Sequence, residues 1–358
     1  MSTLIFKSPP QRVCLLRLSA IGDTCHALAA LRAFQNAWPE TRFTWVIGKV
    51  EAKLMAAILP EIEFITFDKR AMLTELKRLR IIFAERRFDL LLNMQLSLRA
   101  SLVSTLIRAP IKLGFDRARA RELQWLFTNA RILPVEREHV LDSFLGFARA
   151  CGIAPGSVTW RPVLPPEARD YAERLVTDAR SVLLISPCSS HRLRNWTASG
   201  YAALADHAFE AHGMRVILVG GRSAVESRMG EQIVAACRYR PINQIGKDTL
   251  PELLALMARS SLLISPDSGP AHMAAMVGLP VIGLYAATRT ARAGPYLSRA
   301  WCVDKYEQAA QQYFRKSADE LPWTLKIEKP GVMDLIGVEE VILQLDALLA
   351  GSLAKLTP

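Results

Sequence analysis

The chain has 358 residues, of which 51% are hydrophobic, and a formal net charge of +11. This apolar content excludes a disordered chain, and the length fits two domains of ordinary size. No apolar run approaches the ~18 residues that span a bilayer, and residues 1–11 lack the apolar core of a signal peptide, so we expect a cytoplasmic protein. The positive charge indicates an anionic partner, which nucleic acid, an anionic membrane surface and a phosphorylated substrate all satisfy.

The cysteines are scattered and none forms a Cys-x-x-Cys pair, so we expect reduced, mostly structural thiols rather than a zinc site or a disulfide framework. They are Cys14, Cys25, Cys151, Cys188, Cys237 and Cys302. The chain also lacks an Asp-x-Asp pair, with which many sugar-nucleotide enzymes hold a divalent cation. We therefore expect no metal site and no cofactor.

The first half alternates buried strands with helices. An apolar run at 12–18 is followed by a polar turn at 19–23 and a helical run at 24–38, and further strands are predicted at 43–47, 64–67 and 90–93. This alternation is typical of a parallel sheet that helices cover on both faces.

The second half repeats the pattern after a segment marked by Pro155, Pro162, Pro165 and Pro166. Strands are predicted at 181–186, 216–219, 262–264 and 281–284, then a polar helix at 304–316 and an amphipathic helix at 338–349. We expect two doubly wound α/β domains, 1–165 and 166–330, and a terminal segment, 331–358, whose helix packs back on the first domain.

Three polar loops follow predicted strands, at 19–23, 186–196 and 265–272. Ligands bind at the carboxyl ends of strands in open α/β sheets, so we expect the loops to open onto one cleft between the domains. Asp23 has two interpretations: a helix N-cap, or a general base that takes a proton from an attacking hydroxyl.

The second and third loops carry groups that suit a diphosphate. Hydroxyls and a guanidinium donate hydrogen bonds to phosphate oxygens, and a helix start adds free N–H groups and a positive dipole end. The candidates are Ser189, Ser190, Arg194, Ser268 and Gly269, with Asp267 accepting from sugar hydroxyls or bracing the turn, and His272 lining the pocket or serving the fold. The alternative for the second loop is a solvated surface loop.

Three motifs together carry a resemblance: Arg17-Leu18-Ser19-Ala20-Ile21-Gly22-Asp23, Arg194-Asn195-Trp196 and Asp267-Ser268-Gly269-Pro270-Ala271-His272. In order and spacing they resemble the ADP-heptose:lipopolysaccharide heptosyltransferases of glycosyltransferase family 9. The resemblance implies a GT-B fold, with two Rossmann-like domains, the acceptor on the first and the nucleotide sugar mainly on the second. It also implies that Asp23 is the catalytic base and that Arg194, where better-known members carry lysine, grips the donor phosphates.

The resemblance assigns further residues. On the donor side these are Glu226, after the Gly220-Gly221 turn, and Lys247; on the acceptor side they are Arg17, Ser19, Gly22, Arg121 and His139. Some relatives have a cysteine-rich loop after the last strand, whereas only Cys302 precedes Asp304 in this chain, and acceptor or donor preference can differ for that reason.

The stretch 69–87 interleaves apolar residues with positive charge. A basic amphipathic helix of this kind can rest on anionic lipid headgroups at the inner face of the inner membrane, and the alternative is an ordinary solvated face.

The function that the resemblance implies is a metal-independent, inverting transfer of heptose from ADP-heptose to the inner core of lipopolysaccharide. We expect the chain to act as a monomer. The alternatives are a family member that uses another nucleotide sugar, a GT-B-like sugar-nucleotide epimerase, and an anion- or nucleic-acid-binding module. We expect no nucleic-acid partner, because no basic strand is interleaved with aromatic residues.

Overall fold

The computed structural model describes residue 4 and residues 6–353. Its contacts divide the chain into two compact units, Met1–Val163 and Leu164–Pro358. The division follows Val163, close to the boundary that the prolines predict after residue 165. The two units are described separately below.

A six-stranded sheet forms the centre of the first unit, in the order β3-β2-β1-β4-β5-β6. Every neighbouring pair of strands runs parallel. The strands are β1 (Arg12–Leu16), β2 (Arg42–Gly48), β3 (Glu63–Phe67), β4 (Leu90–Asn93), β5 (Ile111–Gly114) and β6 (Ala130–Arg131). In β1 and β4 almost every residue is buried, as expected for parallel strands that helices cover on both faces.

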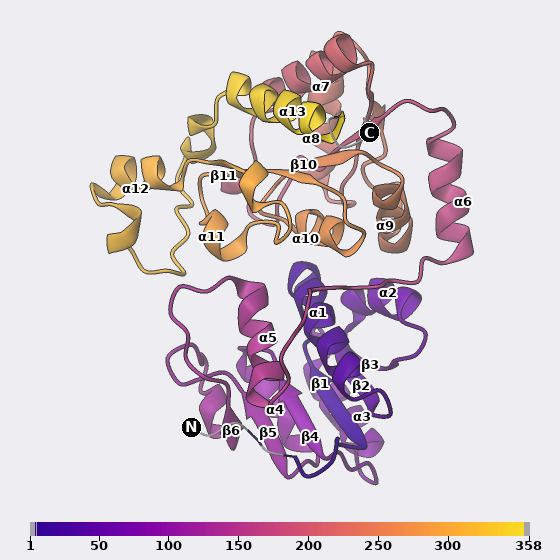
Figure 1. Ribbon diagram of the computed structural model, residues 1–358, viewed down its shortest axis with the longest axis vertical. Helices are drawn as coiled ribbons and strands as arrows, with labels where there is room; N and C mark the ends of the chain where they lie inside the picture. The colour runs from indigo at the N-terminus through magenta and orange to yellow at the C-terminus, as the bar shows by residue number, and fades with distance from the viewer. Residues whose placement is uncertain (1–3, 5, 354–358) are drawn as a thin grey trace. The chain divides into compact units, whose positions relative to one another are not determined.

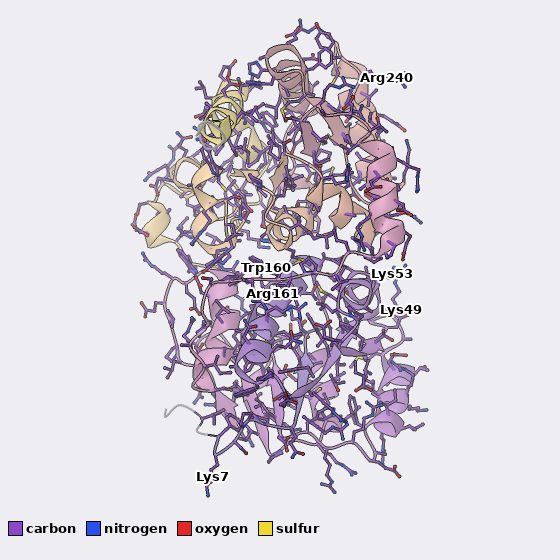
Figure 2. The ribbon with its side chains drawn as sticks, turned by 45° about the vertical axis from the view of Figure 1, so that its right-hand side comes forward. Lys7, Lys49, Lys53, Trp160, Arg161 and Arg240 are labelled. Atoms are coloured by element: carbon purple, nitrogen blue, oxygen red, sulfur yellow. The ribbon has the colours of Figure 1, made fainter. Side chains whose placement is uncertain are left out.

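Helices of the first unit connect these strands, and a last helix follows β6 (Figure 1). They are α1 (Ile21–Ala37), α2 (Lys49–Ile58), α3 (Met72–Ile82), α4 (Leu98–Leu106), the 3-10 turn η1 (Gln124–Leu126) and α5 (Val140–Ala150). Beyond α5, Trp160 donates from its indole nitrogen to the Cys25 carbonyl at 2.8 Å, and Arg32 donates to the carbonyls of Trp160 and Arg161. These bonds attach the closing segment of the unit, where Figure 2 labels Trp160 and Arg161, to helix α1.

The second unit contains another parallel six-stranded sheet, in the order β12-β11-β10-β7-β8-β9. Its strands are β7 (Val182–Ile185), β8 (Arg215–Leu218), β9 (Ile242–Asn243), β10 (Leu262–Pro266), β11 (Val281–Tyr285) and β12 (Val303–Asp304). Numbered within each unit, both sheets have the strand order 3-2-1-4-5-6 of the Rossmann fold. The prediction of two doubly wound domains is confirmed.

The helices of the second unit include four short 3-10 helices, which are labelled η. The helices are α6 (Pro166–Leu175), η2 (Arg192–Arg194), α7 (Ala198–His212), α8 (Ala224–Ala236), α9 (Leu250–Ala258), α10 (Gly269–Met276), α11 (Thr290–Ala293), η3 (Arg299–Trp301), α12 (Tyr306–Phe314), η4 (Ala318–Glu320), η5 (Val332–Leu335) and α13 (Val338–Leu353). The predicted helices at 304–316 and 338–349 correspond to α12 and α13.

Helix α13 belongs to the core of the second unit. Val341, Leu345 and Leu348 are buried in the same hydrophobic cluster as Leu204 and Ala208 of α7. Figure 1 shows α13 lying beside α7. The apolar stripe of the terminal helix is thus covered by the second unit's own α7, and its packing on the first domain stays a prediction.

In both units, the first and fourth strands of the sheet lie side by side, and the chain leaves them toward opposite sides of the sheet. Such a topological switch point leaves a crevice at the carboxyl ends of the two strands, where ligands bind in open α/β sheets. In the first unit the point lies between β1 and β4, and in the second between β7 and β10. Within the described residues, no helix is both long and apolar enough to cross a membrane.

Candidate functional site

The loop after β1 holds the first set of predicted residues, and it is bonded to the loop after β4. Arg17 is 7% exposed and donates from Nη1 to the Met94 carbonyl at 2.6 Å. Gln95 Oε1 accepts from the backbone N–H groups of Leu18, at 3.0 Å, and Ser19, at 3.2 Å. Both loops of the switch point are thereby fixed against each other.

Asp23 stands in the first turn of α1 and pairs with Arg17 through Oδ2. The same oxygen accepts from the Ala20 N–H at 3.2 Å, which is half of a capping box. Asp23 Oδ1 has no partner among the described residues, and the side chain is 34% exposed. The N-cap interpretation of Asp23 is therefore wrong, because Ala20 is the N-cap and Asp23 stands at N3; one of its oxygens serves the helix start while the other remains able to take a proton.

The remaining acceptor-side candidates differ in their surroundings. Gly22 is buried in the first turn of α1. His139 is 2% exposed and caps α5, because its Nδ1 accepts from the Leu141 N–H at 3.0 Å. Arg121 is exposed in the segment between β5 and η1. The structure thus gives His139 a role in the fold, and the acceptor role of these residues stays a prediction.

His26 is a neighbour of this set that the sequence reading missed. It is 4% exposed and packs edge-on to His139, with ring centroids 5.7 Å apart. The signal available was its spacing, since a residue three positions after Asp23 lies on the same face of a helix.

Arg194 is the centre of the second unit's site. It ends η2 after β7, is 8% exposed, and donates from Nη1 to Asp267 Oδ2 at 2.9 Å. It also donates from Nη2 to the Ser190 hydroxyl at 3.1 Å. Asp267 follows β10, so this ion pair joins the two loops of the second switch point.

Glu328 is a second carboxylate at Arg194, and the sequence did not reveal it. Its Oε1 lies 3.2 Å from Arg194 Nε, and its Oε2 lies 3.7 Å from His191 Nε2. The Nε–H of Arg194 nevertheless makes no hydrogen bond among the described residues. A buried guanidinium N–H is therefore left for an incoming acceptor.

The start of α10 adds backbone donors beside this arginine. Ser268 is the N-cap residue, but its side chain does not cap the helix; its hydroxyl instead pairs with the Ser265 hydroxyl at 2.7 Å. The N–H groups at this end, beginning with Gly269, are thus not satisfied by the cap, and they carry the positive end of the helix dipole. His272, one turn into the helix, is 9% exposed with Nε2 4.0 Å from Asp267 Oδ1.

Ser189 makes bonds within its own loop. Its backbone N–H donates to Asn195 Oδ1 at 2.7 Å, and its hydroxyl accepts from the His191 N–H at 3.1 Å. Asn195 therefore helps to hold the turn that presents Ser190 and Arg194. Of the two serines, Ser190 is the one bonded to the arginine.

Glu226 and Lys247 also make local bonds. Glu226 accepts from the Gly221 N–H at 2.7 Å and the Ser223 hydroxyl at 2.6 Å, which fixes the turn between β8 and α8. Lys247 donates to the Asn243 carbonyl. The structure gives Glu226 a role in shaping the turn, and the donor contacts of both residues stay predictions.

The cysteine in the Arg194 loop is a packing residue. Cys188 is 6% exposed, and burial raises the pKa of its thiol to about 12, so it carries no charge at neutral pH. All six cysteines are free. Trp196 is likewise buried, and its indole N–H donates to the Ile336 carbonyl at 3.0 Å.

The chain is similar in sequence to known glycosyltransferases. Residues 77–324 match the family model described as glycosyltransferase family 9 (heptosyltransferase). The chain is 40% identical over 344 residues to the lipopolysaccharide core heptosyltransferase OpsX of Haemophilus influenzae, which covers 96% of this chain and 99% of that protein.

Solved structures agree on the fold. A glycosyltransferase family 9 protein of Veillonella parvula superposes with a TM-score of 0.78 at 23% identity, over 95% of this chain and 97% of the other. The Escherichia coli heptosyltransferase WaaC with ADP-2-deoxy-2-fluoro heptose superposes with a TM-score of 0.65 at 20% identity, over 84% of this chain and 99% of the other. The chain is thus a glycosyltransferase that belongs to glycosyltransferase family 9, the heptosyltransferases.

Proposed function

We propose that this chain transfers heptose from ADP-heptose to the inner core of lipopolysaccharide, with inversion at the anomeric carbon and without a metal ion. The observation that carries the proposal is the Arg194 cluster, in which a buried guanidinium, a hydroxyl and the uncapped start of α10 surround one switch point. The names of relatives supply the substrates: OpsX is a lipopolysaccharide core heptosyltransferase, and WaaC holds an ADP-heptose analogue.

In this mechanism the second unit binds the donor. Negative charge grows on the diphosphate as ADP leaves, and Arg194 with the N–H groups of α10 stabilises it in place. Ser189 holds the loop in shape, and the Ser190 hydroxyl adds a further hydrogen-bond donor to the diphosphate. Asp267 accepts hydrogen bonds from the sugar hydroxyls. Glu226 and Lys247 bind the adenosine part, while His272 lines the pocket.

The first unit supplies the base and the acceptor site. Asp23 Oδ1 takes the proton from the acceptor hydroxyl as its oxygen bonds to the anomeric carbon and the bond to ADP breaks. Arg17, paired with Oδ2, holds the carboxylate in one orientation. The acceptor is bound by Ser19, Gly22, Arg121 and His139.

A direct test uses the purified chain, ADP-heptose and a heptose-free core acceptor. ADP release that requires the acceptor supports a transferase, whereas conversion of the nucleotide sugar without acceptor indicates an epimerase. Activity that survives EDTA supports metal independence, and the anomeric configuration of the product, read by NMR, tests inversion.

We also propose peripheral contact with an anionic membrane at its inner face through α3. Leu73 and Ile81 are 77% and 78% exposed, and Lys77 and Arg80 lie between them. Apolar side chains beside basic ones suit an interface of headgroups and acyl chains. We propose that the chain acts there as a monomer.

A further inference from the structure

Two histidines and one aspartate converge between α7 and α13, and the proposed transfer uses none of them. His207 Nε2 lies 2.8 Å from Asp346 Oδ1, and His212 Nε2 lies 2.7 Å from the same oxygen. Across the described residues, this is the one group of three or more His, Cys, Asp or Glu side chains whose ligand atoms all lie within 4.8 Å of one another.

The ligand set selects a class of ion. Neutral imidazole suits Zn²⁺, Ni²⁺, Cu²⁺ and Fe²⁺, whereas Mg²⁺ and Ca²⁺ prefer oxygen alone. Two imidazoles and one carboxylate are also a common protein ligand set for these metals, with the remaining positions open to water. The side chains are 27–41% exposed, so an ion can enter and water can complete its coordination.

The distances fit a metal with small movements. At metal–ligand bonds of about 2.1 Å, adjacent ligand atoms stand roughly 3.4 Å apart in the tetrahedral coordination that Zn²⁺ prefers. The Nε2–Oδ1 separations here, 2.8 Å and 2.7 Å, are shorter, so each ring must move away from the carboxylate oxygen by roughly 0.6 to 0.7 Å to admit the ion. Rotation of the two rings, whose centroids are 5.5 Å apart, provides that room.

The surrounding charges favour a cation. His212 is the last residue of α7, where the negative end of the helix dipole lies. The other acids of this helix are engaged elsewhere, because Asp206 and Glu210 both pair with Arg238. Asp346 is thus the carboxylate that faces the two rings.

We propose that His207, His212 and Asp346 form a binding site for a divalent transition-metal ion of the Zn²⁺ class, which links α13 to α7. Each neutral imidazole binds the ion through the lone pair of Nε2, with its proton on Nδ1, and the ion also bonds the carboxylate oxygen that both rings now face. The role of the site is structural. Helix α7 begins after the Arg194 loop, at the carboxyl end of β7, and ends with His212 shortly before β8 begins, so the cluster lies toward the amino ends of the strands and the donor loops lie at their carboxyl ends.

The test uses the full-length chain with any affinity tag removed, stripped with EDTA and titrated calorimetrically with Zn²⁺ at neutral pH. We expect one ion per chain and a rise in the thermal midpoint of unfolding. His207→Gln, His212→Gln and Asp346→Asn should each weaken Zn²⁺ binding at least about tenfold. Glu210→Gln, which removes a carboxylate from the same helix outside the cluster, should bind Zn²⁺ as the unaltered chain does.

The absence of saturable binding, or equal affinity in a His207→Gln/His212→Gln double variant, would overturn the proposal. Binding of ADP by each variant serves as the check on folding, since the donor site lies at the opposite sheet edge. Should a histidine variant fail that check, Asp346→Asn, which retains both rings, decides the outcome. Metal uptake is measured without any transfer reaction, so the result is independent of the proposed activity.

Discussion

The Arg194 guanidinium donates to the Asp267 carboxylate at 2.9 Å and thereby joins the loops that follow β7 and β10. These strands flank the switch point of the second sheet, where the fold leaves room for a ligand. The pair is nearly buried, with side chains 10% and 13% exposed, so water screens it weakly. Arg194 is thus oriented before any anion arrives.

Arg194→Ala should weaken ADP binding roughly 10- to 100-fold, the range expected for losing hydrogen bonds to a charged group. Arg192 is the matched control, because it is exposed in the same 3-10 turn. Arg192→Ala should bind ADP with nearly normal affinity. Calorimetric titration with ADP provides the measurement, and unchanged affinity in Arg194→Ala would show that this arginine does not grip the diphosphate.

Glu328→Gln should bind ADP more tightly, roughly three- to tenfold. Glu328 Oε1 lies 3.2 Å from Arg194 Nε, so its charge opposes the approach of a diphosphate, while Asp267 and Ser190 still orient the guanidinium. The gain in affinity should shrink at high salt, because salt also screens the repulsion between Glu328 and the diphosphate in the unaltered chain. Weaker ADP binding by Glu328→Gln would show instead that this carboxylate is needed to position Arg194.

Asp23→Asn should retain donor binding and lose turnover by about 100- to 10,000-fold, the usual contribution of a general base. The amide keeps the shape and the contact with the Ala20 N–H but cannot take the proton. Asp89→Asn is the control, since Asp89 also accepts a backbone N–H, from Arg12 at 2.9 Å, at the amino end of β1. Near-normal turnover in Asp23→Asn would remove the base assignment.

Asp248 makes the stability of the chain depend on pH. Burial raises the pKa of this carboxyl to about 7, and its Oδ2 has no partner among the described residues. The folded chain then holds the proton more tightly than the unfolded chain, so this stability is present in acid and is lost as pH rises from about 4 to about 7. Asp248→Asn should abolish that loss and raise the free energy of unfolding above neutral pH by up to roughly 4 kcal/mol.

Urea unfolding of both proteins in acid and above neutral pH measures the effect of Asp248→Asn. The two should have similar stability in acid and should diverge as pH rises. A constant difference at both pH values would mean that Asp248 does not carry a raised pKa in the folded chain.

Helix α3 gives the membrane proposal its test. Leu73→Ser/Ile81→Ser should reduce co-sedimentation with phosphatidylserine vesicles, because both side chains are exposed beside basic residues. Leu343→Ser removes an apolar side chain that is 66% exposed on α13 and should leave vesicle binding unchanged. Equal binding by all three proteins would indicate that α3 has an ordinary solvated face.

The alternation of strands and helices was readable from the sequence because buried parallel strands form continuous apolar runs. The run at 90–93 coincides with β4, and the run at 181–186 contains β7. By contrast, β6, β9 and β12 have two residues each, which is too short for any periodicity. Sequence patterns therefore predicted the fold class and the outer strand β3, but not these three short outer strands.

The site was predicted in the same uneven way. Asp267 stands directly after β10 and Arg194 lies in the loop after β7, where the fold places ligand-binding loops, and the structure joins them. Glu328 lies in an irregular segment between η4 and η5, so only the folded chain brings it to Arg194. Nor does spacing reveal that His139 caps α5 or that Glu226 holds the turn after β8, since both functions arise from local hydrogen bonds.

The most direct measurement is sugar transfer with a panel of donors, in which the purified chain and a heptose-free core acceptor are mixed with ADP-heptose or with hexose nucleotides and the product is weighed by mass spectrometry. We expect the acceptor to gain the mass of one heptose with ADP-heptose and to stay unchanged with the hexose donors. Transfer from a hexose donor alone would contradict the proposed substrate, and no transfer from any donor, with the acceptor known to be competent, would contradict the proposed function.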